Sequence, residues 1–291
     1  MNSPDGLHRF LKRISFANTI LYIVSAIMIF IALAMSAAAA DVGQFRHSPP
    51  KLRPTHKTIT VMVVDTGVAP DNSFIKPFLL NPVTPDHFDT HGHGTHVTSL
   101  ILGGPGKRKG KSGVEFSNIV CDQVKIIPCK FYNPRANTKE NLDSSIGCFR
   151  QAAELNVDLV NYSAGGVDSS PEEKQAIEAL GALDILLVTA AGNEGSDLNK
   201  YPYYPAKYRL PNIVIVGSLA QPVDKFVGLR RFQSSNFGFS EMFWEIGEAV
   251  LGYTHINESA QYMTGTSQAT ALATNRILKD RCSEINKKKG K

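Results

Sequence analysis

The sequence predicts an α/β domain with a mainly parallel central sheet between two layers of helices. Short apolar runs recur along the chain, segments with a helical pattern separate them, and 43% of the 291 residues are hydrophobic. A strand that is buried on both faces of a sheet has a continuous apolar run. Strands that alternate with helices form a parallel sheet whose faces the helices cover. We therefore expect one three-layer α/β/α domain.

The apolar runs and the segments between them define the expected elements. The predicted strands cover residues 58–64, 124–127, 157–160, 185–188 and 213–216. The predicted helices cover 95–102, 141–155 and 171–180, and a further helix rich in Ala and Leu opens within 263–270. Ser170 and Pro171 before the third helix are typical of a helix N-terminus, because Ser caps the helix and Pro fits its first turn.

The net charge of +5 is unevenly distributed. Basic residues gather before the apolar N-terminal stretch, in the segment 107–111 and in a tail at 282–291, whereas the rest of the chain is acidic in balance. A nucleic-acid-binding protein has its basic residues on one face. We therefore predict no nucleic-acid partner, and we interpret 107–111 as a solvated charged loop.

The first forty residues are predicted to be a signal peptide. Arg9, Lys12 and Arg13 precede an uncharged stretch over 14–40 that ends in four alanines. A basic start, an apolar middle and small residues at the end describe a secretory leader. Residues 14–40 are also long enough to span a bilayer, so an uncleaved membrane anchor is the alternative. The prediction is a secreted or periplasmic protein, in contact with a membrane only if this segment is retained.

The predicted organisation after the leader has three parts. Residues 41–58 contain several prolines and are interpreted as a linker, the domain covers 59–281, and 282–291 is a basic C-terminal tail.

Four cysteines follow the leader: Cys121, Cys129, Cys148 and Cys282. Export permits disulfides, and the spacings fit no zinc module. Two disulfides are therefore expected rather than a metal site. The sequence leaves the pairing open, and Cys121 with Cys129 is conceivable because the segment between them is short.

Of five chemically distinctive motifs, three directly follow predicted strands and two stand at the start of predicted helices. Ligands bind beyond the carboxyl ends of strands in open α/β sheets, so these positions are candidates for a site. In chain order the motifs are DTG at 65–67, HGHGTH at 91–96, NYSAGG at 161–166, TAAGNEG at 189–195 and MTGTSQAT at 263–270.

Taken in this order, the motifs resemble those of the subtilisin-like serine peptidases, over about residues 59–281. The resemblance implies a catalytic triad of Asp65, His93 and Ser267, the chain order of subtilisin. A serine hydroxyl needs a base to become nucleophilic, which His93 would supply while Asp65 orients the imidazole. Asn193 would stabilise the oxyanion together with the backbone N–H of Ser267. The implied activity is hydrolysis of peptide bonds by a secreted endopeptidase through an acyl-enzyme.

The same resemblance implies how a protein or peptide substrate binds. In the family the segment corresponding to Ser163, Ala164 and Gly165 pairs with the substrate backbone as an extra strand. Together with Ala190, Ala191 and Gly192 it walls the first specificity pocket. A monomer is expected. No cofactor is expected either, because no dense acidic loop for structural Ca²⁺ stands out.

The chain departs from the family pattern at three places. Gln268 replaces the usual Met after the nucleophile, Ala271 replaces a Pro, and Glu245-Ile246-Gly247 replaces Ala-Pro-Gly. Gln268 removes no catalytic group, whereas the change at 245–247 is expected to alter the loop geometry there.

Two other functions remain as alternatives. His91, His93 and His96 have the spacing of a metallo-β-lactamase zinc motif, although Thr95 stands where a second metal would need Asp. An inactive binding module with the same fold would be expected to have lost a triad member, and none is lost. His96 corresponds to a packed neighbour of the catalytic His in the family.

Overall fold

The computed structural model describes residues 52, 58–82, 84, 86–104, 120–222 and 229–289, without the side chains of residues 288 and 289. The predicted leader, nearly all of the linker and the basic segment 107–111 lie outside the described residues. All described residues belong to one compact unit, Phe45–Lys291. Within them, no helix combines the length and the apolar character that crossing a bilayer requires.

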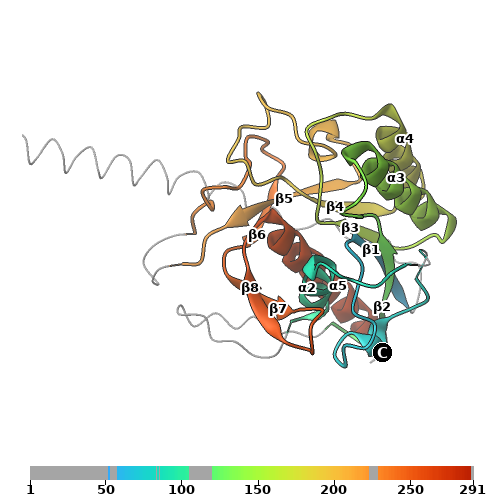
Figure 1. Ribbon diagram of the computed structural model, residues 1–291. Helices are drawn as coiled ribbons and strands as arrows, with labels where there is room; N and C mark the ends of the chain where they lie inside the picture. Colours follow the sequence, from blue (N-terminus) through green and yellow to red (C-terminus); the bar gives the residue numbers. More distant parts are fainter. Residues whose placement is uncertain are drawn as a thin grey trace, which may run out of the picture. The chain divides into compact units, whose positions relative to one another are not determined.

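A six-stranded sheet forms the centre of this unit (Figure 1). The strands are β1 (Ile59–Asp65), β2 (Val124–Lys130), β3 (Leu159–Tyr162), β4 (Leu186–Ala190), β5 (Ile213–Leu219) and β6 (Phe243–Ile246). Their order is β2-β1-β3-β4-β5-β6, and every pair is parallel. The predicted parallel α/β sheet is confirmed, with each predicted strand present.

Strand β6 was not predicted, because a charged residue interrupts its apolar run. Glu245 is only 8% exposed in this strand. Its carboxylate lies 2.7 Å from the guanidinium of Arg276, which compensates the burial of the charge.

Helices cover both faces of the sheet (Figure 1). Helices α3 (Thr138–Glu154) and α4 (Pro171–Ala182) pack together on one face, and α2 (His93–Leu102) and α5 (Thr266–Lys289) lie on the other. A small antiparallel sheet of β7 (Val250–Tyr253) and β8 (Ala260–Met263) packs beside α2. Short 3₁₀ turns, η1 (Lys76–Phe78) and η2 (Ala206–Tyr208), complete the elements.

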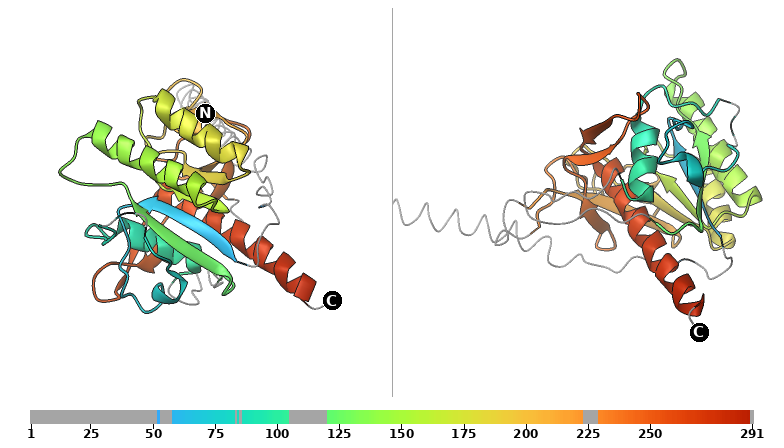
Figure 2. Two further views of the ribbon diagram at one scale, coloured as in Figure 1. Left: turned by 90° about the vertical axis from the view of Figure 1, so that its right-hand side faces the viewer. Right: turned by 90° about the horizontal axis from the view of Figure 1, so that it is seen from below.

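Helix ends follow local capping. The Ser170 hydroxyl accepts a hydrogen bond from Glu173 N–H, as the expected start of α4 requires. Helix α3 begins three residues before its predicted start, because Asn137 and Glu140 form a reciprocal capping box. Helix α5 continues through most of the predicted tail to Lys289, and Figure 2 shows its last turns extending away from the sheet.

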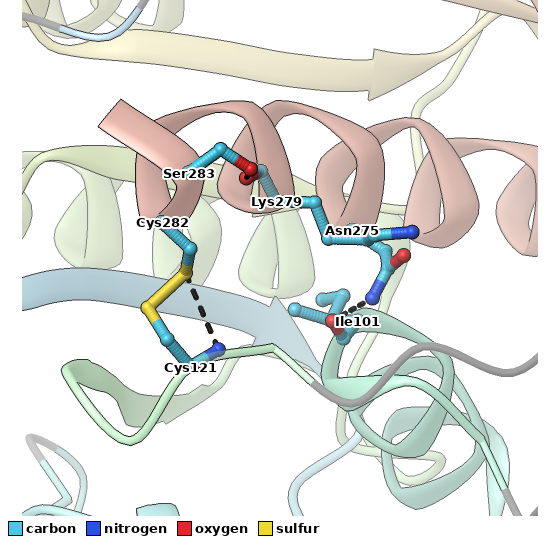
Figure 3. Close-up of a disulfide and its surroundings, with 6 residues drawn as sticks. All are labelled: Ile101, Cys121, Asn275, Lys279, Cys282 and Ser283. Atoms are coloured by element: carbon cyan, nitrogen blue, oxygen red, sulfur yellow. Dashed lines mark hydrogen bonds between the residues drawn. A yellow bond between two sulfur atoms is a disulfide. The ribbon is translucent and has the colours of Figure 1, made fainter. Parts of the chain in front are cut away.

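The two disulfides join Cys121 to Cys282 and Cys129 to Cys148. The conceivable pair Cys121–Cys129 is therefore wrong. Strand β2 extends from Val124 through Cys129 and spans about 17 Å over these residues, more than a disulfide can bridge. Cys129 instead meets Cys148 of α3 in the core between sheet and helices. Figure 3 shows Cys121 bonded to Cys282 of α5.

Candidate active site

Asp65 and His93 form a partly buried pair at the carboxyl end of β1, with Asp65 buried and the His93 side chain 23% exposed. The Asp65 Oδ1 atom lies 2.7 Å from Nδ1 of His93, the first residue of α2. Asp65 is 2% exposed, and its Oδ1 also accepts a hydrogen bond from Thr66 N–H. The close approach of helix and strand requires glycine at 94, because a Cβ atom there would lie 2.1 Å from the Gly67 carbonyl oxygen. The backbone thus places the imidazole against the carboxylate.

The surroundings of His93 favour its protonated form. Burial of the ring lowers the pKa of His93, but the charge of Asp65, the hydrogen bond to Asp65 and the charge of Asp89 together outweigh it, and the pKa is raised above its ordinary value. A base with this property accepts a proton readily.

Asp89, which the sequence analysis missed, links the residue after Asp65 to the residue before His93. It is fully buried and accepts hydrogen bonds from the Thr66 hydroxyl, from Gly92 N–H and from the Thr95 backbone and hydroxyl groups. Burial alone would raise the pKa of the Asp89 carboxyl. The hydrogen bonds that it accepts have the larger combined effect, and the pKa lies below its usual value. The sequence feature that could have identified Asp89 is its position four residues before His93. Asp89 is a positioning residue that ties the end of β1 to the start of α2.

Ser267 lies in the first turn of α5, on the helix that packs against α2. Its hydroxyl donates a hydrogen bond to the Ser163 carbonyl at 2.9 Å. In return, the Ser163 hydroxyl donates to the Ser267 carbonyl at 3.1 Å and accepts from the Asn161 amide at 3.0 Å. Among the described residues, no hydrogen bond joins the Ser267 hydroxyl to His93. The structure thus brings Ser267 to the predicted substrate segment, with its hydroxyl directed to that backbone.

Asn193 is held by its side-chain oxygen. Its Oδ1 accepts hydrogen bonds from Thr266 N–H at 2.8 Å and from the Thr266 hydroxyl at 3.1 Å. Since these hydrogen bonds use the side-chain oxygen and Asn193 is exposed, its amide N–H groups remain available to donate to a ligand beside the start of α5. This is the arrangement that an oxyanion donor needs.

A second residue that the sequence analysis missed, Asn236, shapes the loop that carries Asn193. It is 1% exposed. Its side chain accepts from the N–H groups of Glu194 and Ser196 and donates to the Ala191 carbonyl. Sequence position offers no signal for this role, because Asn236 is far from Asn193 along the chain.

The two predicted walls of the specificity pocket follow neighbouring strands. Ser163, Ala164 and Gly165 come directly after β3, and Ala190 ends β4, with Ala191 and Gly192 next. Since β3 pairs with β4, these segments leave the sheet side by side.

The three histidines of the zinc alternative do not converge on one point, although the His91 and His93 rings pack edge-on with their centroids 6.3 Å apart. His96 is fully buried, its Nε2 lies 3.2 Å from the Gln261 carbonyl oxygen, and burial lowers its pKa to about 4. The His91 ring instead packs edge-on against Tyr132. Within the described part of the chain, no group of three His, Cys, Asp or Glu side chains is placed to hold a metal ion. The geometry gives the zinc reading no support.

The departures from the family pattern lie close to the nucleophile and are accommodated. Gln268 is buried, and its amide nitrogen lies 3.8 Å from the Met263 sulfur. The Gly247 carbonyl accepts a hydrogen bond from Gly265 N–H at 2.9 Å, two residues before Ser267. A Cβ atom at Gly247 would lie 2.4 Å from the Gly265 carbonyl oxygen, so the glycine of the altered loop allows this close contact.

The fold is the one found in the subtilisin-like serine peptidases. A solved structure of the epidermin leader peptide processing serine protease from Staphylococcus aureus superposes with a TM-score of 0.61 at 19% identity, covering 80% of this chain and 69% of that one. A model of the Subtilase family matches residues 56–279, and the chain belongs to this family.

Curated relatives come from the same family. The minor extracellular protease Epr of Bacillus subtilis is 27% identical over 231 residues, which cover 78% of this chain and 33% of Epr. The major intracellular serine protease of the same organism is 29% identical over 226 residues, covering 73% of this chain and 65% of the relative. The chain thus matches less than two thirds of the length of either relative.

Proposed function

We propose that the protein is a serine endopeptidase that cleaves protein or peptide substrates with a triad of Asp65, His93 and Ser267. The observation that carries the proposal is the 2.7 Å contact between the buried Asp65 carboxylate and Nδ1 of the partly exposed His93. This contact holds the proton on Nδ1 and leaves Nε2 free to act as a base. The family to which the chain belongs supports the assignment.

The attacking group has to change its hydrogen-bond partner before it reacts. In the structure the Ser267 hydroxyl donates to the Ser163 carbonyl. Rotation of the side chain toward His93 Nε2 lets the base accept this proton as Ser267 Oγ bonds to the scissile carbonyl carbon. Catalytic hydrogen bonds are often unformed before substrate binds, so this starting position is compatible with the mechanism.

Two groups are expected to stabilise the intermediates. The developing oxyanion receives hydrogen bonds from the Asn193 amide and from Ser267 N–H, which lies in the first turn of α5 and has no partner within the helix. His93 then gives its proton to the leaving amine, and an acyl-enzyme forms on Ser267. Water, activated by His93 in the same way, releases the second product.

Labelling of the nucleophile tests this proposal on the full chain. We expect a fluorophosphonate probe to label Ser267 and casein to be cleaved, and Ser267→Ala to remove both, with a loss of kcat on the order of 10⁶-fold. Ser283→Ala is the matched control, because Ser283 lies exposed on the same helix. Unchanged cleavage by Ser267→Ala would overturn the mechanism. A folded wild-type protein with neither labelling nor cleavage would favour the inactive binding module.

We also propose export, with signal cleavage near Ala40, and activity without a cofactor. Two disulfides agree with an oxidising compartment, and one relative is named an extracellular protease. Edman sequencing of secreted material should begin close to Asp41, whereas an intact Met1 would show a retained leader. Chelator should leave cleavage unchanged, and loss of cleavage in chelator would contradict cofactor independence.

A further inference from the structure

Tyr203 lies between the two segments that are expected to wall the first specificity pocket. A Cβ atom placed on Gly165 would lie 2.5 Å from Cε1 and 2.9 Å from Cζ of this ring. A Cβ atom placed on Gly192 would lie 3.0 Å from Cδ2 of the same ring. Because Cε1 and Cδ2 are opposite corners of a tyrosine ring, the ring spans the space from one segment to the other.

The backbone and the packing both hold Tyr203 in this place. The next residue, Tyr204, exchanges two backbone hydrogen bonds with Gly166, at 2.6 and 2.9 Å, which fixes the chain against the segment after β3. The Tyr203 side chain also packs on a buried cluster formed by Ala191, Leu198, Ala206, Ile215, Phe239 and Met242. The ring therefore has a supporting layer behind it and two glycine-containing segments beside it.

The structure explains why glycine occupies positions 165 and 192, which the sequence analysis did not identify. Any larger residue at 165 would meet both the Tyr203 ring and the Tyr204 carbonyl oxygen, which would lie 2.4 Å from its Cβ atom. Gly192 has a φ of +100°, a conformation that favours glycine, and its missing side chain also leaves room for the ring. The residues around Tyr203 are thus matched to an aromatic ring at this position.

We propose that the Tyr203 ring fills the pocket and restricts cleavage to bonds that follow a small residue, namely Gly, Ala or Ser. The inference rests on the proposed peptidase function and deepens it. A substrate with Phe or Leu at this position would have to displace the ring from its supporting cluster, whereas a methyl or hydroxymethyl group requires no displacement. Specificity of this kind comes from steric exclusion of the larger side chain.

Matched peptides that differ only in the residue before the scissile bond test the inference. For the wild-type protein we expect kcat/KM for the Ala peptide to exceed that for the Phe peptide by at least about tenfold, the scale on which a pocket discriminates by size. Tyr203→Gly should reduce or reverse this ratio by raising cleavage of the Phe peptide. Tyr201→Gly is the matched control and should keep the wild-type ratio, because Tyr201 is 63% exposed and two residues away.

The outcomes separate this inference from the proposed function. A wild-type protein whose Ser267 is labelled by a fluorophosphonate and which cleaves both peptides equally overturns the role of Tyr203 alone. The same holds if Tyr203→Gly is folded and active but retains the wild-type ratio. A protein that is neither labelled nor active on any peptide overturns both. If Tyr203→Gly does not fold, the wild-type ratio and the less disruptive Tyr203→Ala decide the question.

Discussion

Ser163 and Ser267, 104 residues apart in the chain, each donate a hydrogen bond to the backbone carbonyl of the other. The exchange joins the segment that follows β3 to the start of α5. It places the proposed nucleophile directly against the backbone along which a substrate is expected to bind. A substrate N–H that pairs with the Ser163 carbonyl would compete with the Ser267 hydroxyl for the same oxygen.

Removing the Ser163 hydroxyl should weaken this connection. In Ser163→Ala the Asn161 amide and the Ser267 carbonyl each lose a partner in a site where Ser163 is 3% exposed. An unsatisfied buried polar group costs about 1–3 kcal/mol, so we expect the free energy of unfolding to fall by this amount in urea denaturation. Cleavage should persist, because the Ser267 hydroxyl is retained. A stability equal to that of the Ser283→Ala control would contradict the structural role of the exchange.

The pH dependence of cleavage should report the Asp65–His93 pair. Protonated His93 cannot act as a base, so kcat/KM should rise with pH as the imidazole loses its proton. Since the pKa of His93 is raised, the midpoint of this rise is expected above the ordinary value of 6.5. Asp65→Asn removes the neighbouring charge, which should move the midpoint to lower pH and reduce kcat by about 10⁴-fold.

The shift of the midpoint distinguishes an electrostatic role from a purely structural one. Asp71→Asn is the control, because Asp71 is an exposed carboxylate that contacts only Lys76 at 3.9 Å in the ion pairs of the described residues. Its profile should match that of the wild-type protein. If Asp65→Asn has the same midpoint as Asp71→Asn, Asp65 does not set the pKa of His93.

Glu173 should make the protein less stable as the pH rises toward neutrality. This residue is 2% exposed, and its Oε2 atom has no hydrogen-bond partner among the described residues. Burial raises the pKa of Glu173 from 4.5 to about 7, although the nearby Tyr208 hydroxyl opposes the shift. Between these values the folded protein binds more protons than the unfolded chain, so the free energy of unfolding falls as pH increases. The expected loss is about 3 kcal/mol.

Denaturation in urea at a series of pH values measures this effect. Glu173→Gln should abolish most of the decrease between about pH 4.5 and 7, because an amide does not ionise. Glu178→Gln, an exposed position on the same helix, should leave the decrease unchanged. Equal slopes for the two variants would show that Glu173 is not the group responsible.

The two disulfides should differ in their contribution to stability. Cys121–Cys282 closes a sequence separation of 161 residues and Cys129–Cys148 one of 19. In the chain-entropy model these loops correspond to about 5 and about 3 kcal/mol. Urea denaturation of the paired Cys→Ala variants should therefore show the larger loss when Cys121 and Cys282 are replaced. The opposite order would mean that packing around Cys129 and Cys148, both in the core, outweighs loop length.

Sequence patterns were sufficient where the cause is local. Strands buried on both faces have continuous apolar runs, so the sequence predicts the parallel sheet. Ser170 with Pro171 predicts the start of α4. The motifs at 65–67, 91–96 and 263–270 likewise identified candidate residues by their chemistry. Strand β6 was missed because Glu245 needs Arg276, a residue distant in sequence, to make its burial tolerable.

By itself, the sequence determined the fold class, the family and which residue types stand at the strand ends. Only the tertiary structure decided which groups meet: Cys121 with Cys282, Asp89 with the chain neighbours of Asp65 and His93, and the Tyr203 ring with two glycines. The physical reason is that strand and helix formation depend on neighbours within a few residues. Hydrogen bonds, disulfides and steric contacts depend on distances that are set only when the layers pack.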